Sequence, residues 1–175
     1  EGVEHLPATG GVLIVANHQS YLDIPIVAAA TPRHVAFVAR ATLAHSRFLA
    51  FVMRESGAVL IQPNTPDRGA LEAMIGHLQQ GDCVAVFPEG TRTRDGRMGA
   101  FRAGAAVAAR RAGAPIVPAA ILGAFEAWPR SRALPHPRRI RLRFGAPIAP
   151  GTPDAVEVAK QAIERMMQDA EAAKR

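Results

Sequence analysis

A histidine and an aspartate, His18 and Asp23, stand at the two ends of the stretch His18-Gln19-Ser20-Tyr21-Leu22-Asp23. A carboxylate that bonds one imidazole nitrogen fixes the tautomer of the ring and leaves the other nitrogen free to act as a base. On one continuous helix this spacing would put the two side chains about 140° apart, on different faces. The pair can therefore meet only if His18 lies in a turn and Asp23 lies in the first turn of a helix.

An apolar run and a proline provide the elements that this pairing needs. Gly11–Ala16 is typical of a short buried strand, and Ile24–Ala30 of the start of a helix. Pro25 favours a helix start here, because proline is tolerated in a first turn and breaks a helix later. The pair would then lie where a strand ends and a helix begins, the edge at which open α/β sheets bind ligands. The alternative is structural, with Asp23 or Ser20 capping the helix and the histidine as a hydrogen-bonded turn residue.

A second motif, Phe87-Pro88-Glu89-Gly90-Thr91-Arg92, follows later in the chain. Together with Asn17-His18 and Asp23 it resembles the signatures N-H-x-x-x-x-D and F-P-E-G-T-R of the glycerolipid acyltransferase family, that of the 1-acylglycerol-3-phosphate O-acyltransferases. Both motifs are complete and in the family's order, and the likeness runs from about Gly2 to Pro147. The resemblance implies transfer of a fatty acyl group to the free hydroxyl of a lysophosphatidate-like acceptor in phospholipid synthesis.

The resemblance also implies partners and a location. The donor would be acyl-CoA or an acyl-carrier protein, which is a co-substrate, and no separate cofactor or metal is implied. The acceptor is a lysophospholipid, so we expect the domain to be membrane-associated, on an anionic membrane surface at the cytoplasmic face. His18 would be the general base that removes the hydroxyl proton, and Asp23 would hold its imidazole in the required tautomer.

The second motif opens a loop that is rich in glycine and arginine. Glycines let backbone N–H groups approach an anion closely, and the guanidinium of Arg92 offers a planar fork of donors for phosphate. We therefore expect four residues to hold the acceptor's phosphate or polar head: Glu89, Gly90, Thr91 and Arg92. Glu89 could orient Arg92 or accept a hydroxyl. The alternative is a charged surface turn.

Three further residues are candidate substrate contacts, and one residue departs from the family pattern. Arg40 ends the second expected strand, where it either faces the substrate or is simply solvated. Gly57 heads the stretch that matches the family's second motif, but the arginine of that motif falls on Pro63. A proline has neither charge nor N–H for a phosphate. Either Arg68 or Arg54 substitutes, or the acceptor's head group differs from a simple glycerol phosphate.

Three other functions remain open at this stage. One is an acyltransferase for a different lyso-lipid acceptor, such as an ornithine lipid or a glycolipid, which the proline in the second motif favours. A second is a non-catalytic module that binds anionic lipid, against which the intact His18 and Asp23 argue. A thioesterase, with water as the acceptor, would release free acid without any acceptor lipid.

Composition narrows the class of partner. The chain has 175 residues and 49% apolar content, enough for one globular domain with a real core. Its net charge is +6, and all but two of the 21 basic residues are arginines. Such a balance favours anionic lipid or a phosphorylated substrate. Nucleic acid is disfavoured, because aromatics are only 5% and no nucleic-acid-binding signature occurs. A solvated basic face without a partner is the alternative.

Several kinds of machinery have no signature in the sequence. There is no G-x-S-x-G elbow, Walker A loop, G-x-G-x-x-G or H-E-x-x-H, and the other histidines lack the spacing of metal ligands. The expected chemistry therefore has a base but no nucleophile from the protein. Cys83 is the single cysteine and lies in an apolar run, so we expect it to be a small buried side chain.

Strands and helices alternate along the chain, which predicts a single α/β domain with a mostly parallel central sheet flanked by helices, as in glycerol-3-phosphate acyltransferases. We expect the core to cover about residues 2–147. A membrane-anchoring part before it is expected to be absent or removed, because the chain begins at Glu1 and no apolar run reaches the roughly 18 residues of a membrane span. The expected strands cover residues 11–16, 34–39, 57–62, 83–87, 115–121 and 139–145.

The remaining elements follow from proline, glycine and helical spacing. The strand at 139–145 alternates apolar and basic residues, which predicts a half-buried strand near a sheet edge. We expect Thr152-Pro153-Asp154 to start and cap the last helix, and residues 124–138 to form a loop. The expected helices cover residues 24–30, 46–55, 65–80, 104–112 and 153–172.

Overall fold

The computed structural model of the chain describes residues 1–38, 59–61 and 68–173. Four residues singled out above, Arg40, Arg54, Gly57 and Pro63, lie outside the described residues, as does the helix expected at 46–55.

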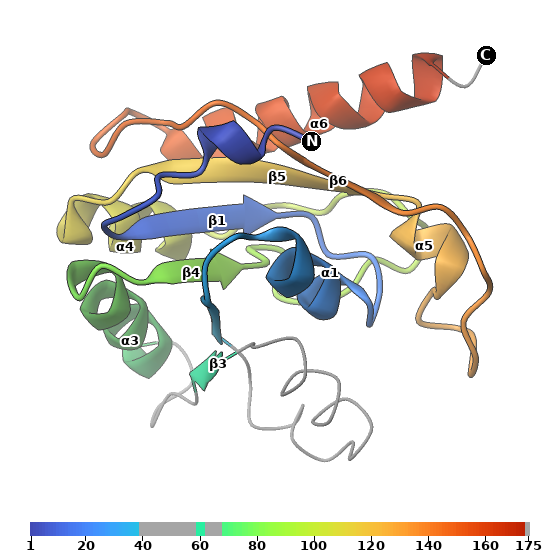
Figure 1. The fold of residues 1–175 in the computed structure, drawn as a ribbon, viewed down its shortest axis with the longest axis horizontal. Coiled ribbons are helices and arrows are strands. Elements are labelled where there is room, and N and C mark those ends of the chain that lie inside the picture. Colours follow the sequence, from blue (N-terminus) through green and yellow to red (C-terminus); the bar gives the residue numbers. More distant parts are fainter. Residues whose placement is uncertain (39–58, 62–67, 174–175) are drawn as a thin grey trace.

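Six strands form one sheet in the order β3-β2-β4-β1-β5-β6. The first five strands pair in parallel, and only β6 runs antiparallel, against β5. This confirms the predicted mostly parallel α/β sheet (Figure 1). The strands are β1 (Val12–Ala16), β2 (Val35–Val38), β3 (Val59–Ile61), β4 (Cys83–Val86), β5 (Ile116–Leu122) and β6 (Arg141–Phe144).

The strand order reverses beside β1. From β1 the chain crosses to β2 on one side of the sheet, and from β4 it crosses to β5 on the other. In a parallel sheet a crevice opens at the carboxyl ends of the strands where the order reverses in this way. The residues that follow β1 and β4 therefore begin at this crevice, and they carry the two motifs.

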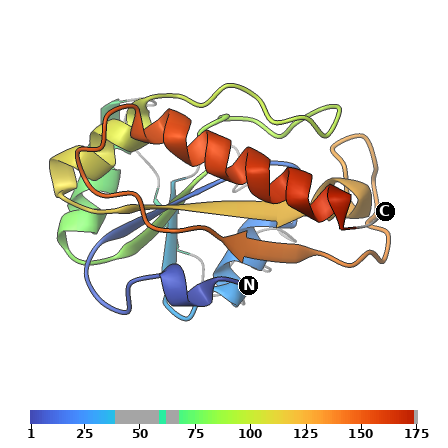
Figure 2. The same ribbon diagram turned by 90° about the horizontal axis from the view of Figure 1, so that it is seen from above.

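Helices cover both faces of the sheet. In Figure 2 helices α4 and α6 lie on one side of the sheet, and α1 and the N-terminal turn lie on the other. None of the helices in the described part of the chain combines the length and the apolar character that crossing a membrane requires. The helices are α1 (Asp23–Ala30), α3 (Arg68–Gln79), α4 (Gly104–Ala112), α5 (Ala124–Ala127) and α6 (Ala155–Ala172), with the 3-10 turn η1 (Val3–His5).

The alternation of side chains along β1 divides the core into two clusters. Leu13 and Val15 pack with residues of α3, α4 and α6 on one face. Val12 and Ile14 pack with residues of α1 and with Leu6 on the other. Every residue of β1 is buried, as expected for a central parallel strand with helices on both faces. Both ends of the strand are therefore held rigidly, including the end that leads into the histidine motif.

The C-terminal half contains one confirmed prediction and two wrong ones. Strand β6 is the edge strand and alternates as predicted, with Leu142 and Phe144 buried. Residues 124–138 were expected to be a loop, but Ala124–Ala127 form the short helix α5, because good helix formers follow a left-handed glycine before the first proline. Asp154 precedes α6 but its side chain makes no capping bond, since its φ of 49° is outside the extended region that capping needs.

Candidate active site

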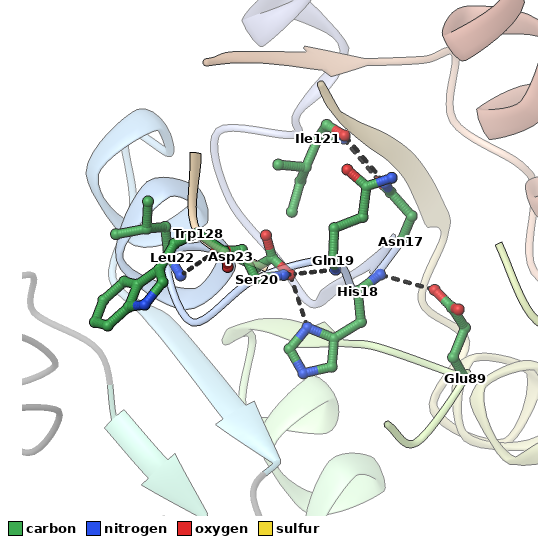
Figure 3. A network of polar contacts seen from close by, with 9 residues as sticks. All are labelled: Asn17, His18, Gln19, Ser20, Leu22, Asp23, Glu89, Ile121 and Trp128. Carbon is green, nitrogen blue, oxygen red and sulfur yellow. Dashed lines mark hydrogen bonds and ion pairs between the residues drawn. The ribbon is translucent and has the colours of Figure 1, made fainter. Parts of the chain in front are cut away.

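His18 and Asp23 meet as their spacing predicts (Figure 3). The Nδ1 atom of His18 lies 2.8 Å from Oδ2 of Asp23. His18 follows the end of β1, and Asp23 is the first residue of α1. The aspartate side chain is fully buried, while the histidine side chain keeps 17% of its surface exposed. Because Nδ1 is engaged by the carboxylate, Nε2 is the nitrogen that can exchange a proton with a ligand.

The carboxylate of Asp23 is the centre around which the turn folds. Its Oδ2 atom also accepts the backbone N–H groups of Gln19, at 2.6 Å, and Ser20, at 2.8 Å. Asp23 thus bonds backward to the turn and makes no capping bond to its own helix. A cap by Asp23 is therefore not what the structure contains, whereas Oγ of Ser20 accepts the N–H of Leu22 at 3.2 Å, just before α1. Its other oxygen, Oδ1, is buried and has no hydrogen-bond partner among the described residues.

Asn17 fastens the end of β1 to the neighbouring strand. Its side-chain Nδ2 donates to the carbonyl of Ile121 at 3.0 Å, and its Oδ1 accepts the N–H of Ile121 at 2.7 Å. The asparagine is fully buried, so both bonds are shielded from water. Asn17 therefore continues the pairing of β1 with β5 by one residue through a side chain, immediately before the catalytic candidate. The first residue of the motif has a positioning role that sequence reasoning did not assign.

The second motif packs an aromatic ring against one face of the His18 imidazole. Phe87 stacks on His18 with ring centroids 4.2 Å apart and an interplanar angle of 17°. Phe37, from β2, in turn stacks on Phe87 at 6.3 Å. An aromatic platform of this kind restricts rotation of the histidine about its side-chain torsions. With one nitrogen held by a carboxylate and one face held by a ring, the remaining nitrogen has a defined direction.

Glu89 joins the two motifs through the backbone. Its Oε1 accepts the N–H of His18 at 2.7 Å, and its Oε2 accepts the N–H of Gly99 at 2.8 Å. Each of its oxygens is thus engaged by a backbone donor, and no hydrogen bond or ion pair joins Glu89 to Arg92 among the described residues. Burial raises the pKa of Glu89, since the ionised carboxyl loses solvation there.

The loop after Glu89 packs directly on the histidine turn. The N–H of Thr93 donates to the carbonyl of His18 at 2.9 Å, and Nε2 of Gln19 donates to the carbonyl of Gly96 at 3.2 Å. Gly90 has a φ of 69°, a conformation that favours glycine, and its N–H closes a tight turn onto the carbonyl of Phe87. The two motifs therefore form one unit, although they are distant in sequence.

The guanidinium of Arg92 lies over the ring of Tyr21, with its central carbon 3.4 Å from the ring centroid. This is the geometry of a cation–π contact. Its Nη1 atom is buried and has no hydrogen-bond partner in the described part of the chain. The ring of Tyr21 in turn packs against the ring of Trp128, with the two centroids 5.2 Å apart. Arg92 is thus placed beside the histidine turn with unused donor capacity. Sequence reasoning missed Tyr21, although an aromatic residue inside the histidine motif was visible.

The other predicted binding residues are less tightly placed. Gly90 and Thr91 are exposed within the loop. Arg68 is exposed at the first residue of α3, and among the described residues no hydrogen bond or ion pair connects it to His18 or Asp23. The structure therefore brings together four of the predicted site residues: His18, Asp23, Glu89 and Arg92.

The site combines a histidine–aspartate pair, at the point where the strand order of a parallel sheet reverses, with a loop rich in glycine and arginine. Comparison with known proteins identifies the family that has this site. The acyltransferase family model matches residues 1–122, so the chain belongs to the acyltransferase family. The chain is also similar to the crystal structure of the 1-acyl-sn-glycerophosphate acyltransferase PlsC from Thermotoga maritima. That similarity has a TM-score of 0.81 and 28% identity, and covers 98% of this chain and 71% of the other.

Curated relatives carry the same kind of name. The chain is 31% identical to the chloroplastic 1-acyl-sn-glycerol-3-phosphate acyltransferase LPAT1 of Arabidopsis thaliana, over 74% of this chain and 37% of the relative. It is 28% identical to the 1-acyl-sn-glycerol-3-phosphate acyltransferase of Bacillus subtilis, over 69% of this chain and 60% of the relative. The chain thus spans between 37% and 60% of the length of these two relatives.

Replacing Glu89 with glutamine should remove the contribution of this carboxyl group to the pH dependence of the free energy of unfolding. Burial raises the pKa of Glu89, so the folded protein binds this proton more tightly than the unfolded chain does. The stability that this residue contributes is therefore fully present below the unfolded pKa, about 4.3, and is lost as pH rises through the higher folded pKa. Urea unfolding of wild type, E89Q and the exposed control E126Q over a pH series measures this effect. If the free energy of unfolding changed with pH equally in all three proteins, the expectation would be contradicted.

Proposed function

We propose that this domain transfers a fatty acyl group from an acyl thioester to the free hydroxyl of a lysophosphatidate-like acceptor, with His18 as the general base. The observation that carries the proposal is the 2.8 Å contact between Nδ1 of His18 and the buried carboxylate of Asp23. It leaves Nε2 as the only ring nitrogen for the acceptor hydroxyl. Membership of the acyltransferase family and the names of the relatives support this reaction type.

The proposed reaction has one tetrahedral intermediate and no covalent enzyme species. Nε2 of His18 removes the hydroxyl proton while the acceptor oxygen attacks the thioester carbonyl. The intermediate collapses by breaking the carbon–sulfur bond, and the imidazolium returns its proton to the leaving thiolate. Asp23 accepts the Nδ1–H bond throughout and stabilises the imidazolium. General base catalysis of this kind contributes roughly 10²–10⁴-fold to the rate.

The acceptor's phosphate is proposed to bind at Arg92 and the adjoining loop. Its guanidinium is oriented by Tyr21, and its Nη1 has no hydrogen-bond partner among the described residues. A bidentate guanidinium–phosphate pair suits such a preorganised fork. Gly90 and Thr91 flank this position and are exposed, so their backbone N–H groups could add further donors.

Arg92→Ala should raise the KM for lysophosphatidate by roughly 10- to 100-fold, because a hydrogen bond to a charged group is worth about 1.5–3 kcal/mol. The kcat should change much less, since the guanidinium does not touch the reacting hydroxyl. Steady-state kinetics with a water-soluble, short-chain lysophosphatidate measure both constants. Arg94→Ala, two residues along the same loop and exposed, is the matched control. An unchanged KM in R92A would remove the assigned role of Arg92.

The donor and the location are part of the same proposal. We propose acyl-CoA or an acyl-carrier protein as the co-substrate, with no other cofactor, and an anionic membrane surface at the cytoplasmic face as the place of action. The net charge of +6 supports a partner that carries negative charge.

A second acceptor class is favoured by one specific observation. Pro63 stands where the family's second motif has an arginine, and it can neither donate a hydrogen bond nor pair with a phosphate. A lyso-ornithine lipid or a lyso-glycolipid is therefore the alternative acceptor. Comparing kcat/KM for lysophosphatidate, a lyso-ornithine lipid and a lyso-glycolipid decides between them. We expect the highest value for lysophosphatidate, and a higher value for either other lipid would replace it as the acceptor.

A further inference from the structure

A basic segment follows helix α5 and is exposed along its whole length. It covers residues 130–139 and is called the arginine loop below. It contains Arg130, Arg132, Arg138 and Arg139 and no acidic residue, so its formal charge is +4. Each of its residues is exposed. In the described part of the chain, no carboxylate lies within ion-pair distance of these four arginines. Their charge is therefore available to a partner.

An apolar side chain stands in the middle of this loop. Leu134 is 75% exposed, whereas the other exposed large hydrophobic residues of the described chain, Val3 and Val158, are each 39% exposed. A single exposed leucine is ordinary on a protein surface. Here, however, two arginines precede it and two follow it within the same ten residues. An apolar tip surrounded by basic residues is the composition of elements that lie in a membrane interface.

The base of the arginine loop is fastened to the histidine turn. Oγ of Ser20 donates to the carbonyl of Trp128 at 2.8 Å, and the Trp128 ring packs on Tyr21. Nε1 of Trp128 donates to the carbonyl of Arg132 at 3.1 Å, within the loop. Figure 1 shows the loop beyond α5, at the end of the sheet toward which β1 and β4 point. The loop and the His18–Asp23 pair are therefore held at the same end of the molecule.

We propose that the arginine loop docks the domain on an anionic lipid bilayer, with Leu134 entering the interface and the four arginines binding lipid phosphates. The docking rests on the exposure and charge of the loop, whereas its use in presenting the acceptor to His18 rests on the proposed function. A nucleic acid is the weaker partner, because the loop's neighbouring aromatic residue, Trp128, is packed against Tyr21 and not offered for base stacking.

Vesicle flotation tests the charge component. The full chain should bind phosphatidylcholine vesicles that contain about 30 mol% phosphatidylglycerol, and should bind pure phosphatidylcholine weakly. The double variant R132Q/R138Q should lose about 25-fold in partition coefficient, since each basic residue near such a surface is worth about fivefold. The matched control R110Q/R165Q removes two exposed arginines from α4 and α6 and should lose less than about threefold. Equal losses in the two variants would overturn the proposal.

The apolar tip is tested separately. Leu134→Ser should lower the partition coefficient by about tenfold, because the variant no longer transfers a leucine side chain out of water. An environment-sensitive dye on Leu134→Cys should shift to the blue on binding, while the same dye on Gln161→Cys in α6 should not. Labelling is selective because the only native cysteine, Cys83, is buried and burial raises its pKa to about 11. A dye at residue 134 that stays in water on bound vesicles would overturn the insertion of Leu134.

Activity distinguishes this proposal from the proposed function. L134S and R132Q/R138Q should keep turnover within about twofold on a monomeric short-chain acceptor and lose about tenfold or more on the same acceptor in anionic vesicles. Vesicle binding without any acyl transfer would leave the docking intact and remove the proposed function. Acyl transfer together with vesicle binding that neither loop variant weakens would keep the proposed function and overturn the docking. Tighter binding of the loop to RNA than to anionic vesicles would also overturn the docking.

Discussion

His18→Ala should lower kcat for acyl transfer by about 10³-fold or more, because the variant lacks the imidazole that acts as the general base in the proposed reaction. The imidazole is held by Asp23 on one side and by Phe87 on one face, so its Nε2 is the group aimed outward. Acyl transfer from a thioester to lysophosphatidate, followed by product mass, measures the loss. The KM for the acceptor should change little, since the histidine acts on the hydroxyl and not on the phosphate.

The chain contains its own control for this variant. His77 and Asp82 have the same spacing in sequence as His18 and Asp23, and their Nδ1 and Oδ2 atoms lie 2.7 Å apart. In that pair, however, His77 is in the last turn of α3 and Asp82 directly precedes β4, so the pair lies at the end of the sheet where β4 begins, whereas His18 follows the end of β1. His77→Ala should therefore keep wild-type turnover. A folded H18A protein with the same kcat as H77A would contradict the proposed mechanism.

Asp23→Asn should lower kcat by roughly 10²–10⁴-fold, as the loss of the carboxylate does in other histidine bases that depend on one. The neutral amide cannot stabilise the imidazolium that forms when His18 takes the proton. Three donors, from His18, Gln19 and Ser20, also converge on Oδ2. An amide oxygen can still accept from the turn, so the fold is retained while the charge is lost.

Two further measurements separate charge from structure in this variant. The amide nitrogen would occupy the buried position of Oδ1, which has no partner among the described residues, so unfolding should become easier by about 1–3 kcal/mol. Asp82→Asn, at a partly exposed carboxylate, should change neither kcat nor stability by a comparable amount. A kcat for D23N within a few-fold of wild type, in protein that remains folded, would show that the carboxylate only shapes the turn.

The pairing of His18 with Asp23 could be predicted because it depends on local chain geometry. A buried strand, a turn and a helix start are each visible in the residue pattern, and only one arrangement of them lets the two side chains meet. The edge position of β6 was predictable for the same reason, since Arg141 and Arg143 alternate with buried residues. Local pattern also set the limits of α4, because Gly113 follows it in the left-handed conformation that ends helices.

The connection between the two motifs could not be predicted in this way. Glu89 bonds the backbone of His18, and Thr93 bonds its carbonyl, only because β4 lies next to β1 in the sheet. That neighbour relation comes from the sheet order, which periodicity does not reveal. The contact of Arg92 with Tyr21 depends on the same relation. Family resemblance predicts a functional role for the second motif, and the structure shows Glu89 bonded to the backbone of His18 and Gly99.

The measurement that tests the central claim most directly is thiol release from palmitoyl-CoA by the wild-type chain, with and without lysophosphatidate, followed by mass analysis of the lipid. We predict release that depends on the acceptor, with one diacyl product formed for each thiol, and no palmitoyl adduct on the protein. His18→Ala should abolish this release and His77→Ala should not. Thiol release that is equal with and without lysophosphatidate and yields free palmitate would contradict acyl transfer by a histidine base. Formation of a covalent acyl-protein would also contradict it.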